Sequence, residues 1–103
     1  MLIEINFMPT LTAPKMTVEN FVQKFLAAAV QCELIGERDL FFPPGNSSIW
    51  FNIKDGVVTF AVFNPKSNCH LTETVQNIFR SVGFQQVKGE LVDGKVEYHR
   101  VEK

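Results

Sequence analysis

Residues 48–63 read SIWFNIKDGVVTFAVF, two β-rich runs on either side of Asp55-Gly56. Asp-Gly between such runs is typical of a tight two-residue hairpin turn. A two-residue loop pairs Lys54 with Val57, and an unbroken ladder then fixes every later pair. This register puts six apolar residues on one face of the hairpin: Ile49, Phe51, Ile53, Val58, Phe60 and Val62. Turn chemistry and hydrophobic pattern therefore agree on which side is buried.

The other side of this hairpin is mixed, with one large aromatic residue among small and polar ones. Trp50 is expected there, because it alternates with the buried positions. The residues expected around it are Asn52, Thr59, Ala61, Phe63 and, from an earlier strand, Met8. Exposed aromatic patches mark interfaces or ligand grooves. The alternative is that the segment 33–47 folds over Trp50 and makes it a satellite of the core.

Strands and helices are predicted on both sides of the hairpin. Residues 2–8 alternate apolar and polar residues, as a half-buried strand does. Residues 18–32 carry an apolar stripe at helical spacing, and Thr17 is a suitable N-cap. A second stripe from Leu71 to Val82 predicts another helix, which Asn68 would cap and Gly83 would end.

Two further stretches extend this pattern. Within the segment 33–47, residues 39–42 are compatible with a short strand, and Pro43-Pro44-Gly45-Asn46 is a turn by composition. Near the end of the chain, Asp93-Gly94 predicts a second hairpin that joins residues 87–92 to residues 95–101.

The order strand, helix, hairpin, helix, terminal strand or hairpin predicts a single α+β domain over residues 1–103. Helices with one apolar stripe and strands with one apolar face favour a two-layer sandwich. Both helices would then cover one face of an antiparallel sheet, the split βαβ or ferredoxin-like plan, here with extra strands. The other sheet face would be uncovered. Many unrelated functions share this plan, so it carries no functional inference.

Composition and charge exclude several classes of partner. The net charge is −1 and no basic run occurs, so binding to nucleic acid has no electrostatic support. An RNA-binding sheet would also need aromatic residues on the uncovered side of its central strand. In the matching strand here, the central aromatic residue Phe60 is instead expected to point inward, toward the helices. No apolar run approaches the ~20 residues of a membrane helix. The start lacks a basic region and a long apolar stretch, so no signal peptide is expected there. The expected location is the cytoplasm, with Cys32 and Cys69 as thiols.

Residues that could perform chemistry are few and scattered. Cys69 and His70 stand at the start of the second predicted helix, where a thiol pKa can be lowered. Adjacent residues of a helix do not face each other, however, and His99 is the only other histidine. No metal-ligand spacing, phosphate loop or cofactor motif occurs, so neither metal nor cofactor is expected.

Two functions from different classes follow. The absence of a catalytic constellation favours a non-catalytic binding or assembly module, a homodimer formed through the uncovered sheet face or a strand edge. Its expected interface residues are Trp50, Asn52, Ala61, Phe63 and Tyr98. The alternative is a small cofactor-free enzyme or a carrier of a small apolar ligand, with a pocket between sheet and helices or at a dimer seam. The polar residues expected to converge there are Cys69, His70, Tyr98 and His99.

Overall fold

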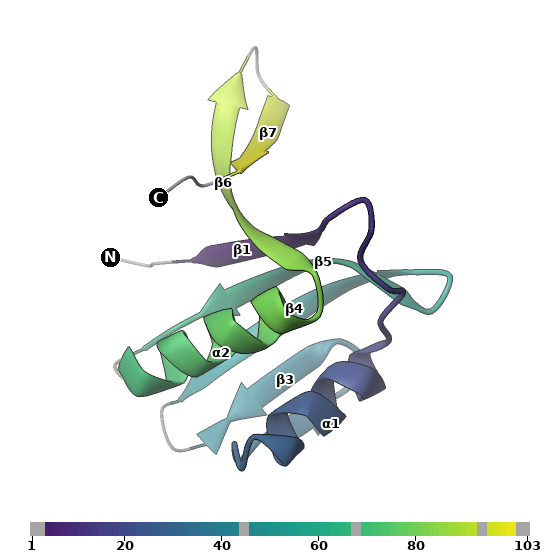
Figure 1. Ribbon diagram of the computed structural model, residues 1–103. Coiled ribbons are helices and arrows are strands. Elements are labelled where there is room, and N and C mark those ends of the chain that lie inside the picture. Colours follow the sequence, from purple (N-terminus) through teal and green to yellow (C-terminus); the bar gives the residue numbers. More distant parts are fainter. Residues whose placement is uncertain (1–3, 44–45, 67–68, 93–94, 101–103) are drawn as a thin grey trace.

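The computed structural model describes residues 4–43, 46–66, 69–92 and 95–100 (Figure 1). The elements are β1 (Ile5–Pro9), α1 (Val18–Ala27), β2 (Glu33–Ile35), β3 (Asp39–Phe42), β4 (Ser47–Lys54), β5 (Val57–Asn64), α2 (Cys69–Ser81), β6 (Phe84–Val92) and β7 (Lys95–Arg100). The predicted α+β class is confirmed. Among the described residues, no helix combines the length and the apolar character that crossing a membrane requires.

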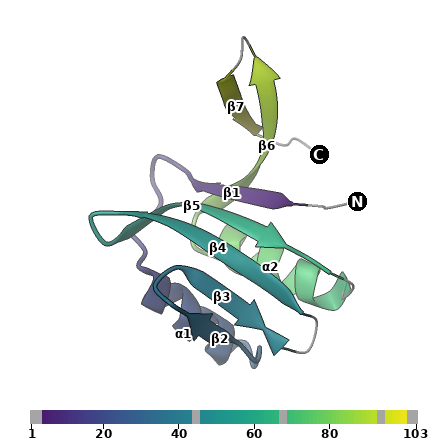
Figure 2. The same ribbon diagram turned by 180° about the vertical axis from the view of Figure 1, so that it is seen from behind.

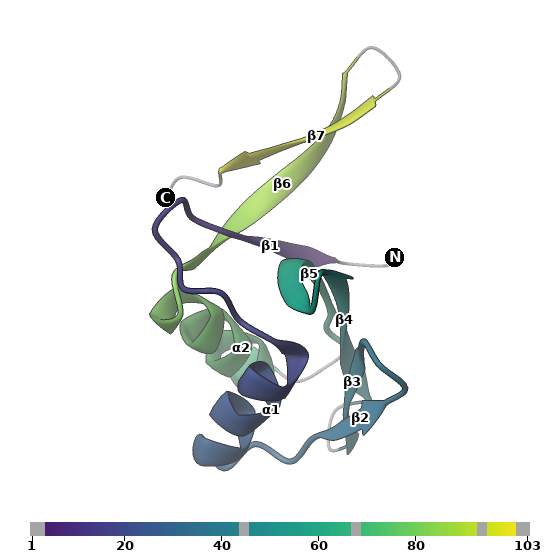
Figure 3. The ribbon, with the colours of Figure 1, turned by 90° about the vertical axis from the view of Figure 1, so that its right-hand side faces the viewer.

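The seven described strands form one open sheet in the order β2-β3-β4-β5-β1-β6-β7. All neighbouring strands are antiparallel, as predicted. Figure 3 shows both helices on the same side of this sheet, and Figure 2 shows the other side, which carries no helix. The segment after α1 contributes β2 and β3 at one edge, and β7 forms the other edge beyond β6.

Helix α1 begins where the sequence predicts. The Thr17 hydroxyl oxygen accepts the backbone N–H of Asn20 at 3.0 Å, and Asn20 Oδ1 accepts the backbone N–H of Thr17 at 3.1 Å. This reciprocal pair is a capping box, which satisfies two N–H groups that the first helical turn leaves without partners.

The end of α1 differs from the prediction, because the helix stops at Ala27 and not near residue 32. Ala29 adopts a left-handed backbone with φ of 60°. Its N–H donates to the carbonyl oxygen of Leu26 at 3.0 Å, and the N–H of Val30 donates to that of Phe25 at 2.9 Å. These two bonds form a Schellman motif, whose left-handed position usually carries glycine. Because alanine occupies that position here, no glycine in the sequence marked the end of the helix.

The β4–β5 turn is the predicted two-residue hairpin. Asp55 and Gly56 both have positive φ, 53° and 78°, as a type I′ turn requires. Lys54 pairs with Val57 on either side of the turn, which confirms the predicted starting register.

The register beyond the turn differs from the prediction. Ile53 pairs with Val58, but the next residue, Asn52, pairs with Phe60. Thr59 is therefore an extra residue on β5, which is a β-bulge. Because side chains alternate along a strand, the bulge turns over every later residue of β5 relative to the expected ladder.

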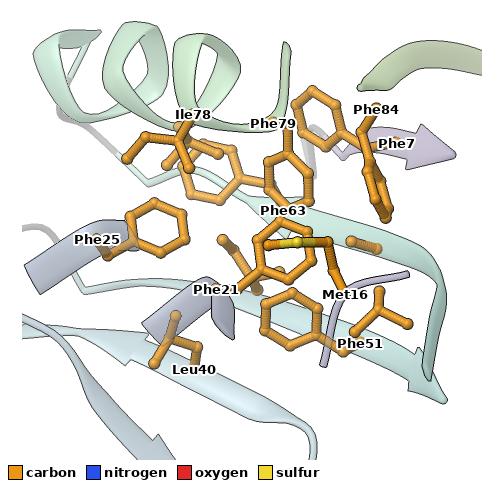
Figure 4. Close-up of a cluster of buried hydrophobic side chains, with 14 of the residues drawn as sticks. Phe7, Met16, Phe21, Phe25, Leu40, Phe51, Phe63, Ile78, Phe79 and Phe84 are labelled. Carbon is orange, nitrogen blue, oxygen red and sulfur yellow. The ribbon is translucent and has the colours of Figure 1, made fainter. Parts of the chain in front are cut away.

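The core lies between the sheet and the two helices and is built largely from phenylalanine. Of the ten phenylalanines, eight are buried: Phe7, Phe21, Phe25, Phe42, Phe51, Phe63, Phe79 and Phe84. The rings of Phe7 on β1 and Phe79 on α2 stack with centroids 4.2 Å apart, and Phe21 of α1 contacts both Phe51 and Phe79 (Figure 4). Phe63 occupies the inward position opposite Ile49, which the unbroken ladder assigned to Val62.

The second helix is followed by the predicted left-handed glycine. Gly83 has φ of 85°, and its carbonyl oxygen accepts the backbone N–H of Thr10 at 2.9 Å. Strands β6 and β7 then pair from Val87–Arg100 to Val92–Lys95, which confirms the terminal strand pair. The expected N-cap Asn68 and the expected turn Asp93-Gly94 lie outside the described residues.

Candidate functional site

Trp50 lies on the side of the sheet without helices, as predicted. Its neighbours on β4, Ile49 and Phe51, are fully buried against the helices, whereas Trp50 is 36% exposed. It pairs with Asp39 on β3 and with Val62 on β5. The described residues of this segment, 33–43 and 46–47, do not fold over the indole, because β3 extends the sheet beside β4. The alternative in which that segment covers Trp50 is therefore wrong.

Two residues expected beside Trp50 are instead in the core. Ala61 and Phe63 are both 0% exposed and belong to the cluster under the helices. The cause is the extra residue Thr59, which turns β5 over after Val58. The expectation that Ala61 and Phe63 line the uncovered side is therefore corrected.

Phe60 and Val62 take their places on the side without helices. Phe60 pairs with Asn52, and Val62 pairs with Trp50. Both side chains are partly buried. The prediction that Phe60 points inward is wrong, for the same reason that Ala61 and Phe63 were misplaced.

The two phenylalanines outside the core lie on the same side of the sheet. Phe41 alternates with Leu40 and Phe42, which are both fully buried, so its ring is on the opposite side from theirs. Phe60 is the second. An aromatic residue on β3, one on β4 and one on β5 thus follow one another across neighbouring strands.

Strand β1 contributes one polar and one apolar residue to this surface. Asn6 pairs with Val62. Met8 lies on the same side, because it alternates with the buried Phe7, as the sequence predicted. We call this surface the open face and define it by Asn6, Met8, Phe41, Trp50, Asn52, Thr59, Phe60 and Val62.

Charged residues also lie on this side of the sheet, next to the residues that define the open face. Asp39 lies beside Trp50 on β3, and Glu33 pairs with Phe41 on the edge strand β2. Lys54 lies at the opposite end of β4, next to the turn. Aromatic residues and methionine are enriched at the centre of protein interfaces, as they are on this face.

A groove lies between the end of α1 and the start of α2. Its volume is about 200 Å³, and its lining residues are Ala29, Val30, Gln31, Phe42, His70, Leu71 and Thr74. The Thr74 hydroxyl donates to the carbonyl oxygen of His70 at 2.9 Å, one helical turn earlier. The groove is mostly apolar, and among its described lining residues His70 carries the one ionisable side chain.

The four polar residues expected to converge on a pocket are not brought together. His70 lines the groove, but Tyr98 and His99 belong to β7, at the far edge of the sheet from the first turn of α2 (Figures 1 and 3). The side chains of Cys69, Tyr98 and His99 lie outside the described part of the structure. The backbone positions alone separate β7 from the groove.

Cys32 is a free thiol, and burial raises its pKa above the ordinary value. A reactive cysteine needs the opposite shift, because the thiolate is the nucleophile. Within the described ranges, no three His, Cys, Asp or Glu side chains come close enough to hold a metal ion.

The chain is thus an α+β protein with an aromatic, helix-free sheet face. No family model, curated protein or solved structure matches it. Its function has to be inferred from the geometry of that face and of the groove.

Proposed function

We propose that this protein is a non-catalytic assembly module that forms a homodimer through the open face of its sheet. The observation that supports the proposal is the exposure of Trp50, 36%, beside Val62 on a face without a helix. Tryptophan is enriched among the residues that contribute most to protein interfaces, because it buries a large area with few rotatable bonds. Phe41, Phe60 and Met8 extend the apolar surface around it.

The size of the sheet favours a weak dimer. Strands lie about 4.8 Å apart and rise about 3.4 Å per residue, so the four strands that carry the open face, at about six residues each, cover on the order of 400 Å² in projection. A specific interface buries about 800 Å² of accessible surface on each partner. The accessible area of the open face is larger than its projected area, because side chains protrude from the sheet. It therefore approaches the lower end of the range of specific interfaces. We therefore expect a dimer that dissociates on dilution.

We also infer that β1, α1, β4, β5, α2 and β6 form a variant of the ferredoxin-like plan. Support comes from the strand order β4-β5-β1-β6, with one helix after β1 and one after β5. In this variant β2 and β3 extend one edge and β7 the other. The free thiol of Cys32 fits the cytoplasmic location that we expect for the protein.

The mass of the protein in solution tests the dimer. Sedimentation velocity from micromolar to millimolar concentration should show wild type passing from monomer to dimer, and Trp50→Glu remaining monomeric. Leu11→Glu is the matched control, because Leu11 is fully exposed in the loop after β1, outside the open face. It should dimerise like wild type. A wild-type monomer throughout that range would refute the proposal, as would equal losses in the two variants.

A small-molecule-binding role is the second candidate function, and the apolar groove with His70 on its rim favours it. A cavity of this size accepts a ligand of roughly one or two aromatic rings. The test is a titration with small aromatic compounds in which the NMR signals of His70 and Leu71 are monitored. Binding should disappear in Leu71→Trp, which fills the groove. If no compound shifts either residue, the candidate fails.

A further inference from the structure

We propose that the outer part of the β6–β7 strand pair completes the dimer interface and packs its apolar side against the other copy of the chain. This role rests on the dimer proposed above, to which it adds a second surface. Three features of the strand pair support it: the way it leaves the sheet, its register and its sequence pattern.

The outer part of this pair is a ribbon of two strands. Strand β6 pairs with β1 from Phe84 to Val87 and with β7 from Val87 to Val92. Beyond Val87, β7 is therefore its one partner among the described strands. We call residues 88–92 and 95–99 the arm. Figures 1 and 3 show the arm standing out from the sheet, clear of both helices.

The register assigns each arm residue to one side of the sheet. Gln86 lies on the side that carries the helices, because its Oε1 accepts a 3.2 Å hydrogen bond from Nε2 of Gln76 on α2. Alternation then places Val87 on the side without helices, where it pairs with Asn6 of the open face. The arm residues on the side without helices are Gly89, Leu91, Val96 and Tyr98. Those on the side with the helices are Lys88, Glu90, Val92, Lys95, Glu97 and His99.

This pattern is typical of a strand pair that is buried on one side. The side without helices has two aliphatic residues, one tyrosine and one glycine, whereas the other side has five charged or polar residues and one valine. A two-stranded hairpin alone is marginally stable in water and needs a covered hydrophobic face. Both helices lie on the opposite side of the sheet, so they do not supply this cover (Figure 3).

A second copy of the chain is the cover that the open face favours. One row of paired residues crosses the sheet from Trp50 through Val62 and Asn6 to the buried Val87 at the base of the arm. The apolar side of the arm thus continues the surface that meets the other copy. Two strands of five residues add about 160 Å² in projection to the roughly 400 Å² of the open face. The contact then comes closer to the size of a specific interface.

Charge substitution at neighbouring residues separates the two sides of the arm. Leu91→Glu places a carboxylate on the apolar side, and its matched control Val92→Glu places one on the polar side. In sedimentation velocity, Leu91→Glu should raise the dissociation constant by more than about tenfold, because it removes a buried aliphatic contact from each copy. Val92→Glu should stay within about twofold of wild type. Equal dissociation constants for the two variants would overturn the role of the arm and leave the dimer standing.

Amide hydrogen exchange tests the cover directly. The arm amides of wild type should exchange at least about tenfold more slowly at a concentration where the protein is dimeric than at one where it is monomeric. In Trp50→Glu, their exchange should not depend on concentration. If the protein dimerises and its arm amides exchange equally at both concentrations, the arm is not covered by the second copy and the inference fails. A wild-type monomer throughout would overturn both the arm contact and the dimer.

Discussion

The side-chain amide of Asn52 donates a 2.8 Å hydrogen bond to the hydroxyl oxygen of Thr59, the extra residue of the β4–β5 pair. The bulge at Thr59 determines which residues of β5 face the helices and which face away. Through it, Phe63 enters the core, and Phe60 joins Trp50 on the open face. One extra residue therefore defines both the core and the candidate interface.

Phenylalanine truncation on β5 tests this register. Phe63→Ala removes a fully buried ring and should lower the free energy of unfolding by about 3–5 kcal/mol. Phe60→Ala should cost clearly less, because Phe60 is only partly buried. Urea unfolding at a concentration where the protein is monomeric measures both. Equal losses would contradict the bulged register.

Glycine at the end of α1 should stabilise the protein. Ala29 has φ of 60°, a conformation that costs an L-residue about 1–2 kcal/mol and glycine almost nothing. Ala29→Gly should therefore raise the free energy of unfolding by up to about 1 kcal/mol after the entropy loss of glycine on folding. Ala28→Gly is the matched control, because Ala28 has φ of −89° and should lose stability. In thermal unfolding, the Tm of Ala29→Gly should lie above that of wild type and the Tm of Ala28→Gly should lie below it.

Alanine at Gly83 should be more harmful than alanine at Gly36. Both glycines have positive φ, so both substitutions strain the backbone. A Cβ at Gly83 would also lie 2.9 Å from the Cβ of Ala13, whereas a Cβ at Gly36 meets nothing within 4 Å. Adding Ala13→Gly to Gly83→Ala should recover part of the difference, because the Ala13 Cα, 3.1 Å from the added Cβ, remains. If chemical unfolding shows the two single variants equally stable, the close approach of Ala13 does not hold.

Cys32 should titrate at higher pH in the folded protein than in the unfolded chain. Burial raises its pKa, because desolvation disfavours the thiolate. Its contribution to stability is therefore full below the ordinary thiol pKa of about 8.5 and is lost as the pH rises through the folded pKa. In a Cys69→Ser background, the pH profile for alkylation of Cys32 by iodoacetamide should have its midpoint at higher pH in the folded protein than in the urea-unfolded protein. A coincident or lower profile would contradict the burial of Cys32.

Much of the open face could be predicted from the sequence, and one strand of it could not. Trp50, Asn52 and Met8 lie where alternation places them, because polar and buried positions alternate clearly on β1 and β4. Residues 57–63 read VVTFAVF and are apolar at both parities. A one-residue shift on β5 therefore exchanges one apolar set for another, and alternation gave no signal for Phe60 and Val62.

Three local features could be predicted from the residues that form them: the Thr17 cap, the positive-φ turn at Asp55-Gly56, and the left-handed Gly83 after α2. Each rests on hydrogen bonds or backbone angles that a few neighbouring residues specify. Three other features depend on packing between distant segments: the bulge at Thr59, the early end of α1 at Ala27 and the in-plane position of β3 beside Trp50. In each case several local conformations were acceptable, and burial of the phenylalanine core selected among them.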